Sequence, residues 1–462
     1  MRIVRKHKLA ILFFLALLPV MVLRDFTPSN ELRYLSIADE ALRDGHLFAF
    51  YNHGLMYADK PPLYLWIVML GRYLFSGGCM FFLSLFSLIP AIVTVHVMRQ
   101  WTAAELPADQ SDVARIMLLT CGLFPVMAVT LRMDMLMVMF IVLALRRFSI
   151  MEQRADFGWH NSWRMGFYVF MAIFSKGPLG ILVPLVSTLV YTLWTRRTRL
   201  FFRVWNFRTL LVLIACCGLW FGCAYLEGGA PYLNEMLFHQ TMGRAVNAFH
   251  HKRPVYFYLV ALTYTMLPWL PYFLVVVWKA VRRRISISAT ERLFISITAS
   301  TFIMLSAFSS KLQVYLLPIF PFTVYLGVLL GVRLKCTIPL TAMKRVGLAL
   351  LVIIFLGGLA LPWLNPYIGY RDAAQEALRQ QQLMPPDASK TLYTFDVRRP
   401  ENLDAYGLLP MEVTDSTGLD YAARTFTGIA RSGSIPAGLS IQDSTRVGSL
   451  IVFTHRPCRT AP

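Results

Sequence analysis

The chain has 462 residues, of which 56% are hydrophobic and 15% are charged, with a mean hydropathy of +0.54. These values exclude a soluble globular enzyme and are typical of a polytopic membrane protein. The net charge of +20 does not indicate nucleic-acid binding, because the basic residues form short clusters between apolar runs. Such clusters follow the positive-inside pattern of cytoplasmic loops.

The first apolar run, residues 9–23, follows a basic N-terminal stretch and has no small-residue cleavage site after it. It therefore predicts an uncleaved transmembrane helix with a cytoplasmic N-terminus. Further apolar runs lie near residues 61–75, 77–98, 113–130, 134–150, 165–176, 178–195, 208–226, 255–279, 291–309, 311–331 and 346–364. The predicted fold is an all-α polytopic membrane protein with about 11 to 13 transmembrane helices.

A polar loop at residues 24–60 separates the first two apolar runs and is predicted to face the outer side of the membrane. A long polar loop beside a membrane is usually functional. Its first motif, Asn30-Glu31-Leu32-Arg33-Tyr34, offers a carboxylate as base or metal ligand beside an arginine suited to a phosphate. An amphipathic interfacial helix with a solvated polar face explains the same residues equally well.

The loop ends on a second motif that runs from Tyr57 through Asp59-Lys60-Pro61-Pro62. Two prolines suit the first turn of a helix, where missing N–H groups cost little. Lys60 would then lie at the membrane boundary and contact a lipid phosphate, although an ordinary snorkelling lysine is the alternative. The positive-inside pattern requires residues 61–98 to make one net crossing. Either the Lys60-Pro61-Pro62 segment is partly re-entrant or interfacial, or one of the apolar runs is not a span.

Two further charged motifs interrupt the apolar runs. Arg132 and Asp134 lie near the outer ends of two runs, where an acid is functional by default and a structural Arg132–Asp134 pair is the alternative. Lys176 precedes Gly177-Pro178, and a plain helix–helix turn explains the glycine and the proline but not the lysine.

The densest His/Arg cluster lies between the runs at 208–226 and 255–279 and contains His239, Arg244, His250 and His251. It predicts binding of an anionic phosphate or a sugar, with His239 as a possible metal ligand. A basic patch that touches lipid headgroups is the alternative. Lys311, shortly before Tyr315, adds a cation on the same side of the membrane.

After Pro366 the sequence becomes mixed and polar. Strand-like runs at residues 391–395 and 449–453, separated by turn signals, predict a small α/β domain over residues 370–462. The predicted organisation is a transmembrane domain over residues 1–366, followed by this small domain on the outer side.

In their order along the chain, these motifs resemble the GT-C class of polyprenyl-phosphate-sugar-dependent transferases. Within that class the chain is most similar to the bacterial lipid A aminoarabinose transferase and protein O-mannosyltransferase group. The resemblance spans about residues 9–330. The matching elements are Glu31-x-Arg33-Tyr34, Lys60-Pro61-Pro62, Arg132/Asp134, Lys176-Gly177-Pro178, His239…Arg244 and Ser310-Lys311…Tyr315…Pro318.

The resemblance implies a multi-pass glycosyltransferase of the bacterial inner membrane, with a periplasmic active site. It would move a sugar from an undecaprenyl-phosphate donor to lipid A, another glycolipid or a protein hydroxyl. A polytopic lipid or sugar transporter (flippase) is the alternative from another class, although no internal repeat of the kind that transporters carry is evident.

The resemblance also implies roles for individual residues. Glu31, Asp134 and Lys60 would be catalytic: either acid would orient or deprotonate the acceptor, and Lys60, with Arg244 or Lys311, would neutralise the departing lipid phosphate. The implied substrate-binding residues are Asn30, Arg33, Tyr34, Tyr57, Asp59, Arg132, Lys176, Arg244, His250, His251, Lys311 and Tyr315. Asp59 and His239 match metal-associated positions, but two ligands are too few to assign the possible divalent metal.

The first motif departs from the family pattern at one position. Relatives commonly begin it with an Asp-Glu pair, whereas this chain has Asn30-Glu31. Asparagine cannot act as a base. We therefore expect this chain to favour an acceptor that is already ionised, such as a lipid phosphate, over a serine or threonine hydroxyl.

Overall fold

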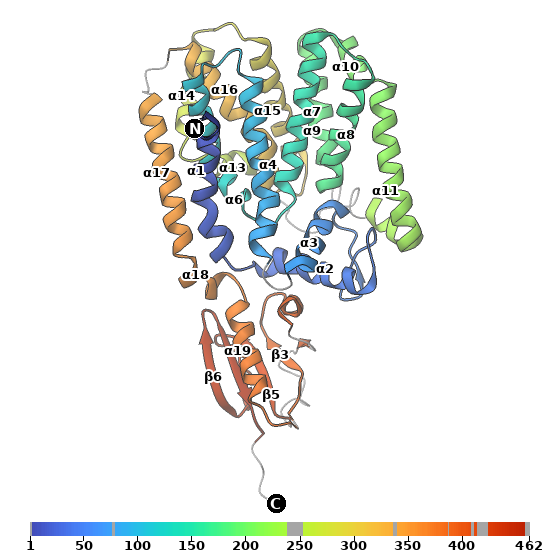
Figure 1. Cartoon of the computed structure of the whole chain (residues 1–462), viewed down its shortest axis with the longest axis vertical. Coiled ribbons are helices and arrows are strands. Elements are labelled where there is room, and N and C mark those ends of the chain that lie inside the picture. Colours follow the sequence, from blue (N-terminus) through green and yellow to red (C-terminus); the bar gives the residue numbers. More distant parts are fainter. Residues whose placement is uncertain are drawn as a thin grey trace, which may run out of the picture.

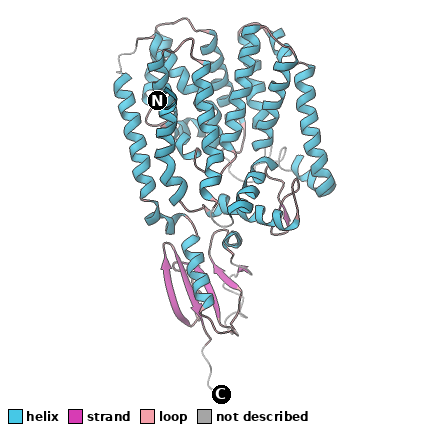
Figure 2. Ribbon diagram, viewed as in Figure 1, coloured by secondary structure: helices cyan, strands magenta, loops and turns pink. Residues whose placement is uncertain are grey.

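The computed structural model of the chain describes residues 2–75, 79–237, 253–335, 340–386, 388–407, 411–413 and 424–457. Long helices form a bundle that makes up most of the molecule, and a small α/β domain projects from one end of it (Figures 1 and 2). The predicted combination of a helical bundle with a C-terminal α/β domain is confirmed.

The bundle joins helices that are successive in the sequence and helices that are far apart in it. Helix α7 packs against α4 and α8, α8 also packs against α11, α15 packs against α9 and α16, and α1 packs against α17. The bundle elements are α1 (Arg2–Leu23), α4 (Met80–Trp101), α5 (Ala108–Leu119), α6 (Leu123–Met127), α7 (Asp134–Arg154), α8 (Trp159–Lys176), α9 (Leu179–Trp194), α10 (Thr198–Val204), α11 (Phe207–Asn234), α13 (Phe257–Thr265), α14 (Leu270–Arg282), α15 (Ala289–Ala307), η3 (Gln313–Ile319), α16 (Phe320–Arg333) and α17 (Leu340–Leu359).

Within the described residues, four helices are long and apolar enough to cross a membrane, and the number rises to six if each of two bent helix pairs is one span. The four are Met80–Trp101, Phe207–Leu237, Gln313–Arg333 and Thr341–Leu359. Shorter apolar helices such as α9 fall below the length that this criterion requires. The sequence-based count of about 11 to 13 spans therefore stays a prediction.

Two of the apolar runs are broken where the sequence predicts continuous segments. The run at 113–130 is divided at Gly122, whose N–H donates to the carbonyl oxygen of Leu267 at 2.9 Å. The run at 255–279 is divided before Pro268 into α13 and α14, which are bent by 116°. A proline cannot donate the hydrogen bond that a continuous helix requires. The two breaks thus contact each other, and a Cβ at Gly122 would lie 2.6 Å from the carbonyl oxygen of Thr265.

The first loop contains a π-helical turn η1 (Pro28–Leu32), α2 (Arg33–Asp44) and the two-residue strands β1 (Tyr51–Asn52) and β2 (Leu55–Met56). Helix α3 (Pro62–Phe75) follows it. Helices α2 and α3 lie against each other at the end of the bundle that carries the α/β domain (Figure 1). Helix α3 has 14 residues, and at about 1.5 Å per residue it is too short to cross a hydrocarbon core of about 30 Å by itself. This length agrees with the predicted interfacial or re-entrant segment after Lys60.

The C-terminal domain packs one helix on a mixed five-stranded sheet. The strand order is β4-β3-β5-β7-β6, with β3 parallel to both β4 and β5 and with β7 antiparallel to β5 and β6. Its elements, after the connecting helix α18 (Leu361–Ile368), are α19 (Arg371–Gln382), β3 (Leu392–Phe395), η4 (Pro400–Tyr406), β4 (Met411–Val413), β5 (Phe426–Arg431), β6 (Ile441–Val447) and β7 (Leu450–His455). The two strand-like runs predicted from the sequence correspond to β3 and β7.

A buried aspartate at the end of α1 joins the bundle to this domain. Asp25 accepts hydrogen bonds from the Tyr406 hydroxyl at 2.8 Å and from the backbone N–H of Arg371 at 2.9 Å, and its own N–H donates to Asn365 Oδ1 at 3.0 Å. Gly369 lies so close to the Asp25 carboxylate that a Cβ there has no room. The orientation of the α/β domain is therefore fixed by specific polar contacts, in addition to apolar packing.

A histidine–aspartate contact predicts pH-dependent docking of the domain. His53 Nε2 lies 3.0 Å from Asp404 Oδ2, and this hydrogen bond raises the pKa of His53. Since the folded-state pKa is raised, the stabilisation is complete below the unfolded value of about 6.5 and is lost as pH rises through the folded-state value. We expect hydrogen exchange in η4 to accelerate as pH rises through that range, after correction for intrinsic exchange rates.

The control is His53→Gln, in which this pH dependence should disappear while the neighbouring Asp25–Tyr406 contact remains. An unchanged pH dependence in His53→Gln would assign it to another group.

Candidate functional site

The first-loop motifs, among the predicted motifs that the structure describes, lie with α2 and α3 at the end of the bundle from which the α/β domain projects (Figure 1). The first loop contributes Glu31 and its neighbours, and the junction before α7 contributes Arg132 and Asp134. Lys176 is the last residue of α8 and Tyr315 lies in η3, which packs against α7. Segments far apart in the sequence therefore form one polar region.

Glu31 is fully buried and both of its carboxylate oxygens are occupied. Arg24 donates two hydrogen bonds to it, at 2.6 and 2.7 Å, and the N–H and hydroxyl of Thr27 donate at 2.8 and 3.0 Å. The fifth donor is the backbone N–H of Leu131, at 2.9 Å. Leu131 immediately precedes Arg132, in the segment just before α7. Glu31 therefore connects the first loop directly to the start of α7. This geometry is that of a positioning residue.

Asp134 is also fully buried and lies between two cations. Lys176 Nζ donates to Oδ1, and Arg132 Nε donates to Oδ2 at 3.1 Å. Lys176, which a plain helix–helix turn did not explain, is thus the partner of Asp134. Lys176 Nζ also lies 4.8 Å from the centroid of the Tyr315 ring, within the range of a cation–π interaction. The Arg132–Asp134 pair, which the sequence offered as the structural alternative, is present.

Arg132 retains hydrogen-bonding capacity for a ligand. In the described part of the chain its side chain bonds only through Nε, so both terminal NH₂ groups have no protein partner there. Its side chain is 23% exposed, whereas the carboxylate it contacts is inaccessible. A partly exposed guanidinium whose two NH₂ groups have no partner among the described residues is suited to a phosphate oxygen pair.

Tyr34 is a neutral hydroxyl within the field of these charges. Burial raises the pKa of Tyr34 to about 12, and the neighbouring charges that act on it belong to Arg132, Asp134, Arg33 and Asp59. Tyr34 therefore keeps its proton at neutral pH and is able to donate it in a hydrogen bond. The ring of Tyr34 packs edge-on against that of Tyr64, with 5.7 Å between centroids.

Asn30 belongs to the π-helical turn η1, and Arg33 is the first residue of α2, directly after it. Arg33 donates from Nε and Nη2 to the carbonyl oxygen of Ser29, at 3.1 and 2.5 Å, and both Arg33 and Asn30 are half-buried. Arg33 thus stabilises the turn that presents Glu31. Lys311 is likewise used internally, because it is 3% exposed and donates to the backbone carbonyl oxygens of Arg253 and Phe308.

Tyr57, Asp59 and Lys60 lie on the segment that enters α3. Tyr57 is buried, and Asp59 and Lys60 are half-buried. Pro62 is the first residue of α3, as the first-turn preference of proline predicts. Lys60 is therefore placed at the junction between the loop and α3.

Glu227 on α11 is a residue that motif reasoning missed. Its carboxylate accepts hydrogen bonds from three consecutive backbone N–H groups, those of Leu47, Phe48 and Ala49, at 2.8, 2.9 and 3.1 Å. His46 Nδ1 lies 3.2 Å from the same carboxylate. The available signal was an isolated acid at the end of the apolar run at 208–226. The carboxylate organises the part of the first loop that leads to Asp59 and Lys60.

We expect Glu227→Gln to loosen that segment. An amide has one acceptor oxygen and no charge, so it cannot satisfy the three N–H groups, and a buried N–H left unsatisfied costs about 1–3 kcal/mol. Hydrogen exchange over residues 45–60 should accelerate, with little change in α7. The matched control is Asp109→Asn, which removes an exposed carboxylate elsewhere. Equal exchange in both variants would contradict the role of Glu227.

Several predicted residues lie outside the described residues. They are His239, Arg244, His250 and His251. Among the residues that the structure does describe, no group of three or more His, Cys, Asp or Glu side chains is arranged to hold a metal ion. The possible divalent metal at Asp59 and His239 thus stays a prediction.

Relatives with assigned names are aminoarabinose transferases. The chain is 26% identical over 322 residues to the undecaprenyl phosphate-alpha-4-amino-4-deoxy-L-arabinose arabinosyl transferase of Edwardsiella ictaluri, covering 68% of this chain and 56% of that protein. It is 26% identical over 345 residues to the transferase of the same name from Pseudomonas aeruginosa strain LESB58, covering 72% and 61%. An uncharacterised Aquifex aeolicus protein is 24% identical over 323 residues, covering 67% and 62%.

These alignments span about six tenths of the length of the curated relatives. No model of a known protein family matches the chain.

Solved structures extend the similarity to the whole chain. The crystal structure of ArnT from Cupriavidus metallidurans bound to undecaprenyl phosphate superposes with a TM-score of 0.73, at 18% identity and with 98% of each chain covered. The apo form of that ArnT gives a TM-score of 0.69 at 19% identity, with 96% of each chain covered. The chain has the ArnT fold. The sequence-based resemblance to the aminoarabinose transferase group is confirmed.

In this ArnT fold the structure brings together most of the predicted residues that it describes. Contacts join Glu31 to the start of α7, and Asp134 to Arg132 and Lys176. Lys176 in turn contacts Tyr315, and Tyr34 lies in the field of Arg33, Asp59, Arg132 and Asp134. Lys311 is satisfied by backbone carbonyl groups in a separate contact.

Proposed function

We propose that the chain is an integral membrane glycosyltransferase that moves a sugar from an undecaprenyl-phosphate donor to lipid A or another acceptor at the periplasmic face of the bacterial inner membrane. The ArnT fold and the names of the curated relatives support this proposal. The positive-inside distribution supports a periplasmic location for the end of the bundle that carries the α/β domain.

One observation supports the proposal beyond the fold. The buried carboxylates of Glu31 and Asp134 have both oxygens hydrogen-bonded, whereas the terminal NH₂ groups of Arg132 have no partner among the described residues. The charges of Glu31 and Asp134 are compensated within the protein, so they hold cations in place without presenting negative charge to a ligand. Arg132 bonds to Asp134 through Nε and is 23% exposed, so its terminal NH₂ groups remain available to a ligand. Such a fixed cation is suited to the charge that develops on a departing lipid phosphate.

We assign Lys60 and Arg132 to the phosphate of the donor, because they lie on two segments that meet at this end of the bundle. Asn30 lies in the turn beside them, Arg33 directly follows that turn, and Tyr34 offers a hydroxyl that stays protonated. Lys176 acts through Asp134 and Tyr315 as a positioning residue.

The occupied carboxylates also bear on the acceptor. Neither Glu31 nor Asp134 has an oxygen that is not already bonded to a cation or a hydrogen-bond donor. A general base must be able to reach and accept the proton of the acceptor. We therefore propose an acceptor that is already ionised near neutral pH, such as a phosphate of lipid A, in agreement with asparagine at position 30.

The test is sugar transfer by the full-length protein, purified in detergent, with an undecaprenyl-phosphate-linked aminoarabinose donor. Phosphorylated lipid A, dephosphorylated lipid A and a serine/threonine peptide are offered as acceptors, and products are identified by mass spectrometry. We expect transfer to phosphorylated lipid A and none to the other two. Robust transfer to the peptide by the parent protein would overturn the acceptor assignment.

The same preparation distinguishes transfer from transport. Failure to consume any undecaprenyl-phosphate-sugar donor, together with substrate flux in liposomes, would overturn the transferase proposal. The variant Lys60→Ala should lose transfer, about 100-fold or more, since it removes a cation from the developing charge.

A further inference from the structure

A second basic site lies at the opposite end of the bundle. A pocket of about 440 Å³ opens between the loop after α7 and the segment that connects α9 to α10. Figure 1 places α10 at the end of the molecule farthest from the α/β domain. Four arginines line the pocket, together with Glu152 and Phe157: Arg196, Arg197, Arg199 and Arg203.

The charge of this pocket is only partly compensated. Glu152 accepts a hydrogen bond from Tyr191 at 2.8 Å and lies 3.4 Å from Arg197. Within the described residues, no carboxylate pairs with Arg196, Arg199 or Arg203. The arginines thus exceed the one acid of the lining by three charges. An anion is the ligand that such a surplus attracts.

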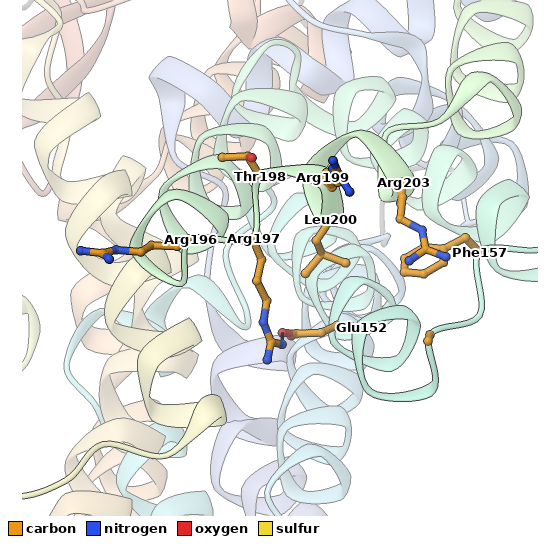
Figure 3. A pocket seen from close by; sticks show the side chains of 9 residues that line it. Glu152, Phe157, Arg196, Arg197, Thr198, Arg199, Leu200 and Arg203 are labelled. Atoms are coloured by element: carbon orange, nitrogen blue, oxygen red, sulfur yellow. Dashed lines mark hydrogen bonds and ion pairs between the residues drawn. The ribbon is translucent and has the colours of Figure 1, made fainter.

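The side chains are held in part by the pocket itself. Figure 3 shows Arg197 directed toward Glu152, and Arg203 alongside Phe157 on the other side of Leu200. The Arg203 guanidinium lies 4.4 Å from the centroid of the Phe157 ring. Stacking on the ring leaves the edge of a guanidinium available for bidentate hydrogen bonds to a phosphate.

Exposed aromatic side chains flank these arginines along the chain, and the Arg292 guanidinium lies 5.8 Å from the ring centroid of one of them, Trp194. Trp194, Phe202 and Phe207 lie on the same stretch of chain and are 47%, 71% and 76% exposed. Large aromatic side chains at a boundary between water and lipid are typical of a membrane interface. A basic pocket beside exposed aromatic residues matches a molecule with an anionic head and apolar chains.

We propose that this pocket binds the phosphate headgroup of an anionic phospholipid, with its acyl chains against Trp194, Phe202 and Phe207. A free phosphate ion would satisfy the arginines alone, but it would make no use of the exposed aromatic residues. The site is separate from the proposed transfer site and does not depend on the proposed activity.

The test is lipid binding by the full-length protein in detergent, measured by native mass spectrometry during titration with phosphatidylglycerol or phosphatidylcholine. The variant Arg199→Gln/Arg203→Gln removes two exposed arginines of the pocket. We expect its apparent affinity for phosphatidylglycerol to fall about 25-fold, from about fivefold for each arginine. The control Arg283→Gln removes an exposed arginine after α14 and should leave the affinity unchanged.

Two further measurements distinguish a lipid headgroup from a free phosphate ion. They are lipid binding by the variant Phe202→Ser and a titration with inorganic phosphate. If the ligand is a lipid, Phe202→Ser weakens phosphatidylglycerol binding and inorganic phosphate alone gives no arginine-dependent adduct. Equal binding of phosphatidylglycerol by the double variant and by Arg283→Gln would overturn the site. An arginine-dependent phosphate adduct that Phe202→Ser leaves intact, without preference for phosphatidylglycerol over phosphatidylcholine, would overturn the lipid assignment.

Discussion

Asp134→Asn is expected to destabilise the protein by about 3–5 kcal/mol, because it leaves Lys176 buried beside an uncharged side chain. Lys176 is only 6% exposed and cannot recover its hydration without local rearrangement. Transfer should also be lost, since Arg132 and Tyr315 are held through the same cluster. Thermal unfolding in detergent and the lipid A assay measure the two effects.

A second variant separates stability from activity at this cluster. Asp134→Leu/Lys176→Met removes both buried charges and replaces them with apolar groups, which is often neutral for stability. Arg132 is 23% exposed, so water compensates for its lost partner. We expect the unfolding temperature to recover while transfer stays absent. Parent-like stability in the single variant Asp134→Asn would show that the cluster does not hold the structure together.

Glu31→Gln is expected to have the second large effect on the stability of the protein. The carboxylate accepts five hydrogen bonds, two of them from Arg24, which is itself 12% exposed. Loss of its charge leaves that guanidinium uncompensated and is expected to cost about 3–5 kcal/mol. The contact with Leu131 also weakens, so hydrogen exchange should accelerate both in η1 and at the start of α7.

The pH dependence of transfer distinguishes a positioning role from a catalytic one. If Glu31 positions the site, Glu31→Gln lowers the rate equally at all pH values and the shape of the profile is retained. Loss of the acidic limb alone would assign the base to Glu31 and contradict our interpretation. Glu401→Gln is the matched control, because Glu401 is a partly exposed carboxylate that pairs with Arg399 at 3.5 Å.

Local patterns in the sequence predicted the general architecture correctly. Runs of apolar residues gave the helices, because a membrane requires long apolar segments with satisfied backbone groups. Lys60-Pro61-Pro62 and the distribution of basic residues predicted that the next segment does not simply cross, and this stays a prediction, although α3 has only 14 residues. The two strands that the sequence marked in the C-terminal domain are both present.

Breaks within the apolar runs were harder to predict. Pro268 gives a local reason for a bend, but hydropathy alone does not reveal the break at Gly122 between α5 and α6. The small side chain is required there because the backbone of Thr265 and Leu267 approaches it closely. That requirement arises only once α13 is packed against the segment.

The sequence by itself determined the class of the protein, the order of its helices and the residue types at its charged junctions. Only the tertiary structure decided their partners. Asp134 bonds to Lys176 across 42 residues, Glu31 to Leu131 across 100, and the first loop to Glu227 across about 180. A buried charge must find its counter-charge wherever the fold brings one near, and no local pattern encodes that choice.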